Sequence, residues 1–238
     1  MRYPVELVPG TLLRRYKRFM ADVVLEDGRE VVVHVPNSGT MKTCIEPGCR
    51  VLVSPADGPK RKLKWTLEQS FMGEGGCTAI MVNTQLPNHL VKEGILAGLA
   101  PSLAGYDSVR SEVRYGSRNS RIDLLLEAEG RPPCWVEVKN ATMLAQPGMS
   151  RFPDAVTTRG QKHLLELADM AEQGHRAVIF YLASRSDARA VGPADDIDPE
   201  YGRLLREVVA RGVEAVAHGL HITSASLVLG AELPVVLA

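Results

Sequence analysis

The chain has 238 residues, and its 28 lysines and arginines balance its 28 aspartates and glutamates, so the formal net charge is zero. This balance excludes a polycation, and any contact with nucleic acid must come from local basic patches. Apolar residues make up 45% of the chain and charged residues 24%, which is typical of a globular protein. Neither a membrane helix nor a signal peptide is indicated, because no apolar run is long enough. We therefore expect a cytoplasmic protein.

The four cysteines match no zinc-site spacing, and no disulfide framework is expected in a reducing compartment. We expect all four to be buried small apolar residues. They are Cys44, Cys49, Cys77 and Cys134.

The first 82 residues predict a small β-barrel domain. Strands are expected at 19–26 and 30–35, on either side of the strong hairpin turn Asp27-Gly28. Further strands are expected near 49–54 and 63–71. Short strands joined by tight turns are typical of an OB-type barrel. The predicted domains are therefore 1–82, OB-like, and 83–238.

Two basic patches in this barrel segment contain aromatic residues and no acid. Cations can bind phosphates while rings stack on bases, so the patches indicate binding of nucleic acid. The alternative is a solvated edge strand, in which lysines and arginines discourage edge-to-edge association. The residues expected to bind nucleic acid are Arg14, Arg15, Lys17, Arg18, Lys62, Lys64 and Trp65.

The second part of the chain predicts a mixed α/β sheet flanked by helices. A helix from His89 to about Leu99 would have Asn88 as its N-cap, and residues 143–158 show no period and are expected to form a loop. Other helices are expected at 159–173 and 199–211. Strands are expected at 109–115, 177–183, 213–218 and 226–229.

Three aspartates near the third helix resemble a metal cluster: Asp195, Asp196 and Asp198. We favour a helix start instead, because Asp198-Pro199-Glu200 combines an N-cap, a first-position proline and an acid near the positive end of the helix dipole.

The hairpin at 120–140 carries the strongest chemical signal. Side chains alternate along a strand, so Glu137 and Lys139 point the same way, and Asp123 can join them if the hairpin folds back. Two carboxylates from separate strands can hold Mg²⁺, and a metal can activate water against a phosphodiester. The spacing resembles the motif of the PD-(D/E)xK nuclease superfamily. The alternative is a solvent-facing hairpin with a cross-strand Glu–Lys pair.

Short motifs from end to end resemble the sugar fermentation stimulation protein A (SfsA) family. They include 15–19, 35–41, 61–63, 120–123, 136–140, 152–155 and 159–163. The resemblance implies an N-terminal OB-like domain and a C-terminal PD-(D/E)xK nuclease-like α/β domain. It also implies DNA binding, with a regulatory part in sugar (maltose) metabolism.

The resemblance assigns site residues by position. Asp123 and Glu137 would be ligands of Mg²⁺ or Mn²⁺, with Glu112 as a third carboxylate, and Lys139 would polarise the attacking water. Gln161 and Lys162 would contact phosphate or water from the helix that follows.

Two hypotheses follow for the function. One is a metal-dependent nuclease whose barrel holds the strand, and the other is a DNA-binding regulator without turnover. DNA is the expected partner, mainly through contacts independent of base sequence, with RNA as the alternative. A homodimer is kept as the alternative to a monomer. A sugar-metabolism enzyme is not supported, because no nucleotide loop or cofactor signature is present.

Overall fold

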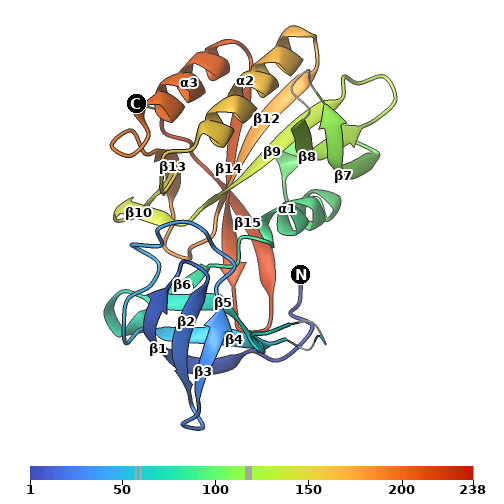
Figure 1. Cartoon of the computed structure of the whole chain (residues 1–238). Helices are drawn as coiled ribbons and strands as arrows, with labels where there is room; N and C mark the ends of the chain where they lie inside the picture. The colour runs from blue at the N-terminus through green and yellow to red at the C-terminus, as the bar shows by residue number, and fades with distance from the viewer. Residues whose placement is uncertain (57, 59–60, 116–119, 238) are drawn as a thin grey trace.

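The computed structural model describes residues 1–56, 58, 61–115 and 120–237. A β-barrel and an α/β domain lie end to end, and the long strands of the α/β domain reach toward the barrel (Figure 1). Of the described helices, none is long and apolar enough to cross a membrane.

The barrel forms from five antiparallel strands in the order β3-β2-β1-β4-β5, and a pairing of β3 with β5 at His34 and Thr66 closes it. Val23, Val33 and Val51 are fully buried inside, which explains the alternation of apolar residues along these strands. The OB-type barrel is therefore confirmed. Its strands are β1 (Val8–Tyr16), β2 (Met20–Leu25), β3 (Glu30–His34), β4 (Arg50–Pro55) and β5 (Trp65–Met72), followed by η1 (Glu74–Gly76) and β6 (Thr78–Met81).

The second domain is built on a six-stranded sheet in the order β15-β14-β12-β9-β8-β7. The strands β9, β12 and β14 are parallel, while β7, β8 and β15 pair antiparallel at the edges. The predicted α/β class is confirmed. The strands are β7 (Ser108–Tyr115), β8 (Ser120–Glu127), β9 (Cys134–Ala141), β12 (Arg176–Ala183), β14 (Glu214–Ile222) and β15 (Leu227–Leu233).

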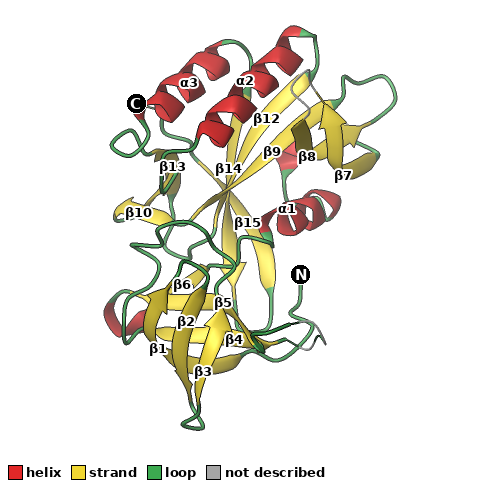
Figure 2. Cartoon of the chain, viewed as in Figure 1, coloured by secondary structure: helices red, strands yellow, loops and turns green. Residues whose placement is uncertain are grey.

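Helices cover both faces of this sheet (Figure 2). Side chains of α2 (Thr158–Glu172) and α3 (Pro199–Ala210) pack with Ile179 and Tyr181 of β12. On the other face, α1 (Pro87–Leu96) packs with Val178 and Phe180, and η2 (Pro101–Leu103) adds to the same cluster. Because both faces are covered, β12 is a continuous apolar run.

Three local expectations were wrong. Residues 143–158 are not a loop throughout, because β10 (Met143–Gln146) and β11 (Met149–Phe152) form a small sheet with β13 (Ala190–Pro193). Asn88 is not an N-cap, because α1 already begins at Pro87. Cys77 is exposed, whereas the other three cysteines are buried. These features depend on distant parts of the chain, which a local pattern does not report.

Hydrogen bonds between distant segments join the barrel to the α/β domain. The backbone N–H of Thr40 donates to Asp154 Oδ2 at 2.8 Å, and Gln69 Nε2 donates to the carbonyl oxygen of Thr223 at 2.7 Å. The strand β6 also forms a bridge from Ile80 to Arg185. The boundary between 1–82 and 83–238 stays a prediction, but the two domains share a tightly bonded junction.

Candidate functional site

The two strands of the predicted site hairpin separate where its carboxylates begin. β8 and β9 pair only from Leu124 to Leu126, opposite Val136 to Cys134. Beyond this point β8 continues along β7, and β9 continues along β12. We call the space between β8 and β9 beyond Leu124 and Val136 the strand opening. In the strand opening, backbone groups of β8 and β9 no longer pair with each other, so a polar side chain can bind them instead.

Asp123 lies at the start of the strand opening. Its Oδ2 accepts a hydrogen bond from the backbone N–H of Val138 at 2.7 Å, and its Oδ1 accepts one from Asn88 Nδ2 at 2.7 Å. Burial raises the pKa of Asp123 to about 6, and the negative charge of Glu137 adds to the increase. The two carboxylates are therefore close enough to repel each other.

Glu137 is 2% exposed and extends toward α2. Its Oε1 accepts from Lys139 Nζ at 2.6 Å and from His163 Nδ1. Burial alone would raise the pKa of Glu137, but the Lys139 ammonium and His163 outweigh it and hold this pKa below its usual value. The other oxygen, Oε2, is buried without a hydrogen-bond partner among residues 1–56, 58, 61–115 and 120–237. An unsatisfied charged oxygen is costly, which makes it a place where a ligand can bind.

His163 orients Glu137 from helix α2. The Nε of Arg159 donates to His163 Nε2 at 3.4 Å. The other ring nitrogen, Nδ1, is within hydrogen-bond distance of Glu137 Oε1 and lies 3.3 Å from Lys139 Nζ. The sequence-based site set contained neither His163 nor Asn88. For His163 the sequence did give a signal, because it has the best case for function among the histidines, in the first turns of the predicted helix beside Arg159 and Lys162.

Gln161 and Lys162 contact other carboxylates than the Asp123–Glu137 pair. Gln161 Nε2 donates to both oxygens of Asp198, at 2.9 and 3.2 Å. Lys162 Nζ lies 3.7 Å from Glu166 Oε1, which also accepts from Ser120 at 2.7 Å. Both side chains lie on α2, and within the described parts of the chain the carboxylates seen in contact with them are those of Asp198 and Glu166.

Glu112 lines the same pocket as Asp123, and Glu137 is not among the residues that line it. It lines a pocket of about 610 Å³ between α1 and the β7–β8 edge, together with Asn88, Lys92 and Asp123. Its backbone has a positive φ of 56°, which is uncommon for a residue other than glycine. Glu112 thus faces the same solvent-filled space as Asp123.

The donor atoms suit a hard divalent cation held by few protein ligands. No cluster of three His, Cys, Asp or Glu side chains arranged to hold a metal occurs in the described part of the chain. Mg²⁺, however, is often bound by one or two carboxylates and water. Asp123 and Glu137 supply two carboxylates, the mutual repulsion that a cation would relieve, and the unsatisfied Oε2. The residues present therefore fit such an ion.

The first basic patch consists of Arg14, Arg15, Lys17 and Arg18, and two of these side chains already form hydrogen bonds within the barrel. Arg14 Nε donates to Asp22 at 2.7 Å, and Arg15 donates to the carbonyl oxygens of Asn37 and Gly39 at 2.8 and 3.0 Å. Lys17 and Arg18 are exposed. All four line one pocket of about 470 Å³, so the patch remains a cationic surface in which Arg15 also shapes a loop.

The second basic patch, which runs in the sequence from Lys60 to Trp65, borders the domain junction. Lys62 and Lys64 are exposed, and Trp65 is half-buried against the barrel core. Lys62 and Arg61 line a pocket of about 400 Å³ with Gln85. Lys60, part of this patch in the sequence, lies outside the described residues.

Comparison with known proteins identifies the family. Residues 13–81 match the model described as "SfsA N-terminal OB domain", and residues 85–226 match "Sugar fermentation stimulation protein RE domain". A "Sugar fermentation stimulation protein homolog" from Geobacter metallireducens is 55% identical over 238 residues, covering 100% of both chains. The homolog from Geobacter sulfurreducens is 54% identical over 235 residues, covering 99% of this chain and 98% of its own.

A solved structure has the same architecture. It is described as "The structure of Pyrococcus Furiosus SfsA in complex with Ca2+", with a TM-score of 0.87, 29% identity, and coverage of 99% of this chain and 98% of that one. The agreement covers both domains and nearly the whole sequence. This chain belongs to the sugar fermentation stimulation protein family.

Proposed function

We propose that this protein is a divalent-metal-dependent nuclease that hydrolyses phosphodiester bonds in nucleic acid held by its barrel. One observation carries the proposal. At the strand opening, burial and then the charge of Glu137 raise the pKa of Asp123, and the buried Oε2 of Glu137 lacks a partner among the described residues. Two repelling carboxylates beside a buried ammonium are typical of a catalytic site rather than a structural ion pair.

Asp123 and Glu137 would hold the cation through carboxylate oxygens. When bound, a divalent cation supplies positive charge to phosphate oxygens and lowers the pKa of a bound water. The Pyrococcus furiosus relative, described as a complex with Ca²⁺, supports a divalent ion for this family. For this chain we propose Mg²⁺ or Mn²⁺ as the working ion, with Glu112 reaching the same space from the α1 side.

Lys139 would act on the attacking water or on the phosphate. Its side chain is 11% exposed, and its ammonium is held 2.6 Å from Glu137 Oε1. A buried ammonium fixed by one carboxylate has other hydrogens to donate, and its charge stabilises negative charge that develops on phosphate oxygens. Lys139 is thus a candidate for orienting the reactants without further movement.

A path for nucleic acid leads from the barrel to Asp123. Gln85, in the segment between the domains, lines both the pocket of Arg61 and Lys62 and the pocket of Asp123. Phosphates bound by the second basic patch would therefore lie beside the carboxylate site. We propose DNA as the partner, with RNA as the alternative, and little readout of base sequence because cations on phosphates carry none.

The second candidate function is a DNA-binding regulator of sugar metabolism without turnover. One observation favours it: the Lys139 ammonium already pairs with the Oε1 of Glu137, and His163 contacts the same oxygen. A carboxylate that already has a cation beside it would need no metal.

Cleavage assays separate the two functions. Labelled single- and double-stranded DNA and RNA are incubated with the protein and Mg²⁺, Mn²⁺ or EDTA. We expect cleavage only with metal, and a loss of about 1000-fold or more in Asp123→Ala and Lys139→Ala. Asp195→Ala is the matched control, since Asp195 is paired with Arg206 on the surface of α3.

Binding is measured beside cleavage. Both site variants should retain affinity for DNA, and this affinity should fall steeply with salt concentration if the basic patches carry it. Binding that is unaffected by EDTA, with no cutting under either metal, would favour the regulator.

A further inference from the structure

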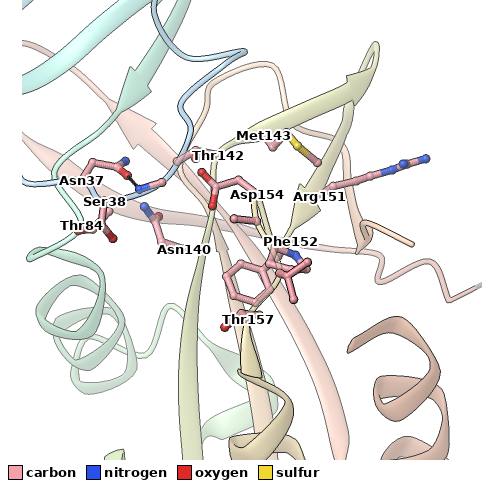
Figure 3. Close-up of a pocket in the computed structure, with 14 residues that line it drawn as sticks. Asn37, Ser38, Thr84, Asn140, Thr142, Met143, Arg151, Phe152, Asp154 and Thr157 are labelled. Carbon is pink, nitrogen blue, oxygen red and sulfur yellow. Dashed lines mark hydrogen bonds between the residues drawn. The ribbon is translucent and has the colours of Figure 1, made fainter. Parts of the chain in front are cut away.

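A pocket of about 320 Å³ lies at the junction of the barrel and the α/β domain (Figure 3). Asn37 and Ser38 reach it from the barrel, Asn140 and Thr142 from the end of β9, and Phe152 from β11. Its volume is at the lower limit of ligand pockets, which suits one small group rather than a whole oligomer.

The walls of this junction pocket are fixed in place. Asp154 binds the backbone N–H of Thr40, and a Cβ added to Gly39 would lie 2.0 Å from Asp154 Oδ2. Arg15 holds the same loop through the carbonyl oxygens of Asn37 and Gly39. A pocket held this way is preformed, so a ligand would not have to order it.

Hydrogen-bonding groups in the pocket are oriented and available. The hydroxyl of Ser184 donates to Asn140 Oδ1, which fixes the amide with its Nδ2 as a donor. Asn140 Nδ2 has no hydrogen-bond partner within the described residues, whereas the hydroxyl of Thr142 lies beside the Cys44 thiol. The amide donor, and an acceptor lone pair of the hydroxyl, therefore remain for a ligand.

The pocket carries no net charge. Of the described residues that line it, only Arg151 and Asp154 are charged. Arg151 pairs with Asp196 at 2.8 Å, and Asp154 is engaged by Thr40. The ring of Phe152 lines the pocket and is held against Tyr201, with 5.2 Å between ring centroids. Amides, a hydroxyl and an aromatic ring suit the base and sugar of a nucleotide better than its phosphate.

The pocket and the candidate site are built on the same two elements. Asn140 directly follows Lys139 on β9, with its side chain on the opposite face of the strand, and Thr157, which lines the pocket, caps the helix that carries His163. We propose that the junction pocket binds one nucleoside unit of the substrate strand, the one that adjoins the phosphate at the strand opening. This inference rests on the proposed nuclease function.

Photocrosslinking tests the pocket without requiring cleavage. The full chain is mixed, in EDTA or in Ca²⁺, with a short oligothymidylate that carries one 4-thiothymidine at an end or in the middle, and with the matching 4-thiouridine RNA. After irradiation, adducts are mapped by peptide mass spectrometry. We expect adducts within residues 140–157, and a loss of adduct when free thymidine, but not inorganic phosphate at equal ionic strength, is added.

Two variants remove single contacts. Asn140→Ala removes the amide donor without adding a charge, and Thr142→Val removes the hydroxyl at constant volume. Each should lower the adduct yield within 140–157 by about 3- to 10-fold, the effect of one neutral hydrogen bond. Thr11→Val, on the exposed face of barrel strand β1, is the matched control and should leave the yield unchanged.

The outcomes separate this proposal from the nuclease. Adducts confined to barrel residues other than 37–39, or yields unchanged in both variants, would overturn the nucleoside pocket even if metal-dependent cleavage is found. Adducts within 140–157 that respond to both variants would support the pocket even if no cleavage is found, and the failure would then lie with the nuclease proposal.

Discussion

Two groups of acidic residues in this chain have opposite roles. Asp195 is paired with Arg206 at 2.6 Å and Asp196 with Arg151 at 2.8 Å. Asp198, 1% exposed, accepts from two backbone N–H groups and from the Gln161 amide. Each acid of this run has partners of its own, so the run is structural, and the interpretation of Asp198 as a helix cap is confirmed.

The pair at the strand opening is not satisfied in the same way. Asp123 and Glu137 repel each other, and one buried oxygen of Glu137 has no partner in the described parts of the chain. The comparison teaches that the spacing of acidic residues in the sequence does not distinguish a metal-ligand site from a helix cap. The two are distinguished by whether each carboxylate oxygen already has a hydrogen-bond donor or a cation beside it.

The largest expected difference is in cation affinity. Glu137→Gln removes the charge but keeps the shape, so Mn²⁺ binding measured by titration calorimetry should weaken by about 100-fold or more. Asp196→Asn, in the structural run, should bind Mn²⁺ like the unmodified protein. Affinity of Glu137→Gln within a few-fold of the unmodified protein would place the cation elsewhere.

The next effect is a pH dependence of stability in EDTA. The pKa of Asp123 is about 6 in the folded protein against 3.8 for an ordinary aspartate, so the folded chain binds this proton more tightly than the unfolded chain. The free energy of unfolding should therefore fall by up to about 3 kcal/mol as pH rises from about 4 to 6, and then stay level. Urea unfolding across this range should show the slope in the unmodified protein and lose it in Asp123→Asn. Equal slopes in the two proteins would contradict the burial of this charge.

A smaller effect is expected from the cap. Asp198→Ala leaves the first N–H groups of α3 and the Gln161 amide without an acceptor, which should lower the free energy of unfolding by about 1–2 kcal/mol. Asp195→Ala, which breaks an exposed pair, should cost less than about 1 kcal/mol. Mn²⁺ affinity should change in neither variant, and a loss in Asp198→Ala would show that the two acidic groups are coupled.

The smallest effect distinguishes the two nitrogens of His163. An asparagine amide can take the place of Nδ1, and a glutamine amide that of Nε2. Because Nδ1 is the nitrogen bonded to Glu137, His163→Asn should keep Mn²⁺ affinity within about threefold, whereas His163→Gln should lower it by about tenfold. The reverse order would assign the positioning role to Nε2.

Local patterns predicted a large part of the fold and part of the site. Strand alternation placed Glu137 and Lys139 on one face, and their 2.6 Å contact agrees with it. The barrel turn at Asp27-Gly28 and the start of α3 are equally local signals. Such features depend on residues within a few positions of each other, so propensity and period are enough to find them.

The rest depends on contacts between distant segments. Asn88 lies 35 residues before Asp123 and was read as a cap because its pairing with that carboxylate leaves no trace in the local pattern. Arg15 belongs to a basic run, yet its guanidinium binds carbonyl oxygens more than twenty residues away. The strand opening itself is invisible to alternation, since a period of two does not tell where a neighbouring strand departs.

The bonded junction has a consequence for substrate choice. Thr40 with Asp154, Gln69 with Thr223, and the bridge from Ile80 to Arg185 tie the two domains at separate points. Domains joined this way resist hinge motion, so the junction pocket keeps a fixed width. For the proposed nuclease, we therefore expect single strands and frayed ends to enter before an intact duplex does.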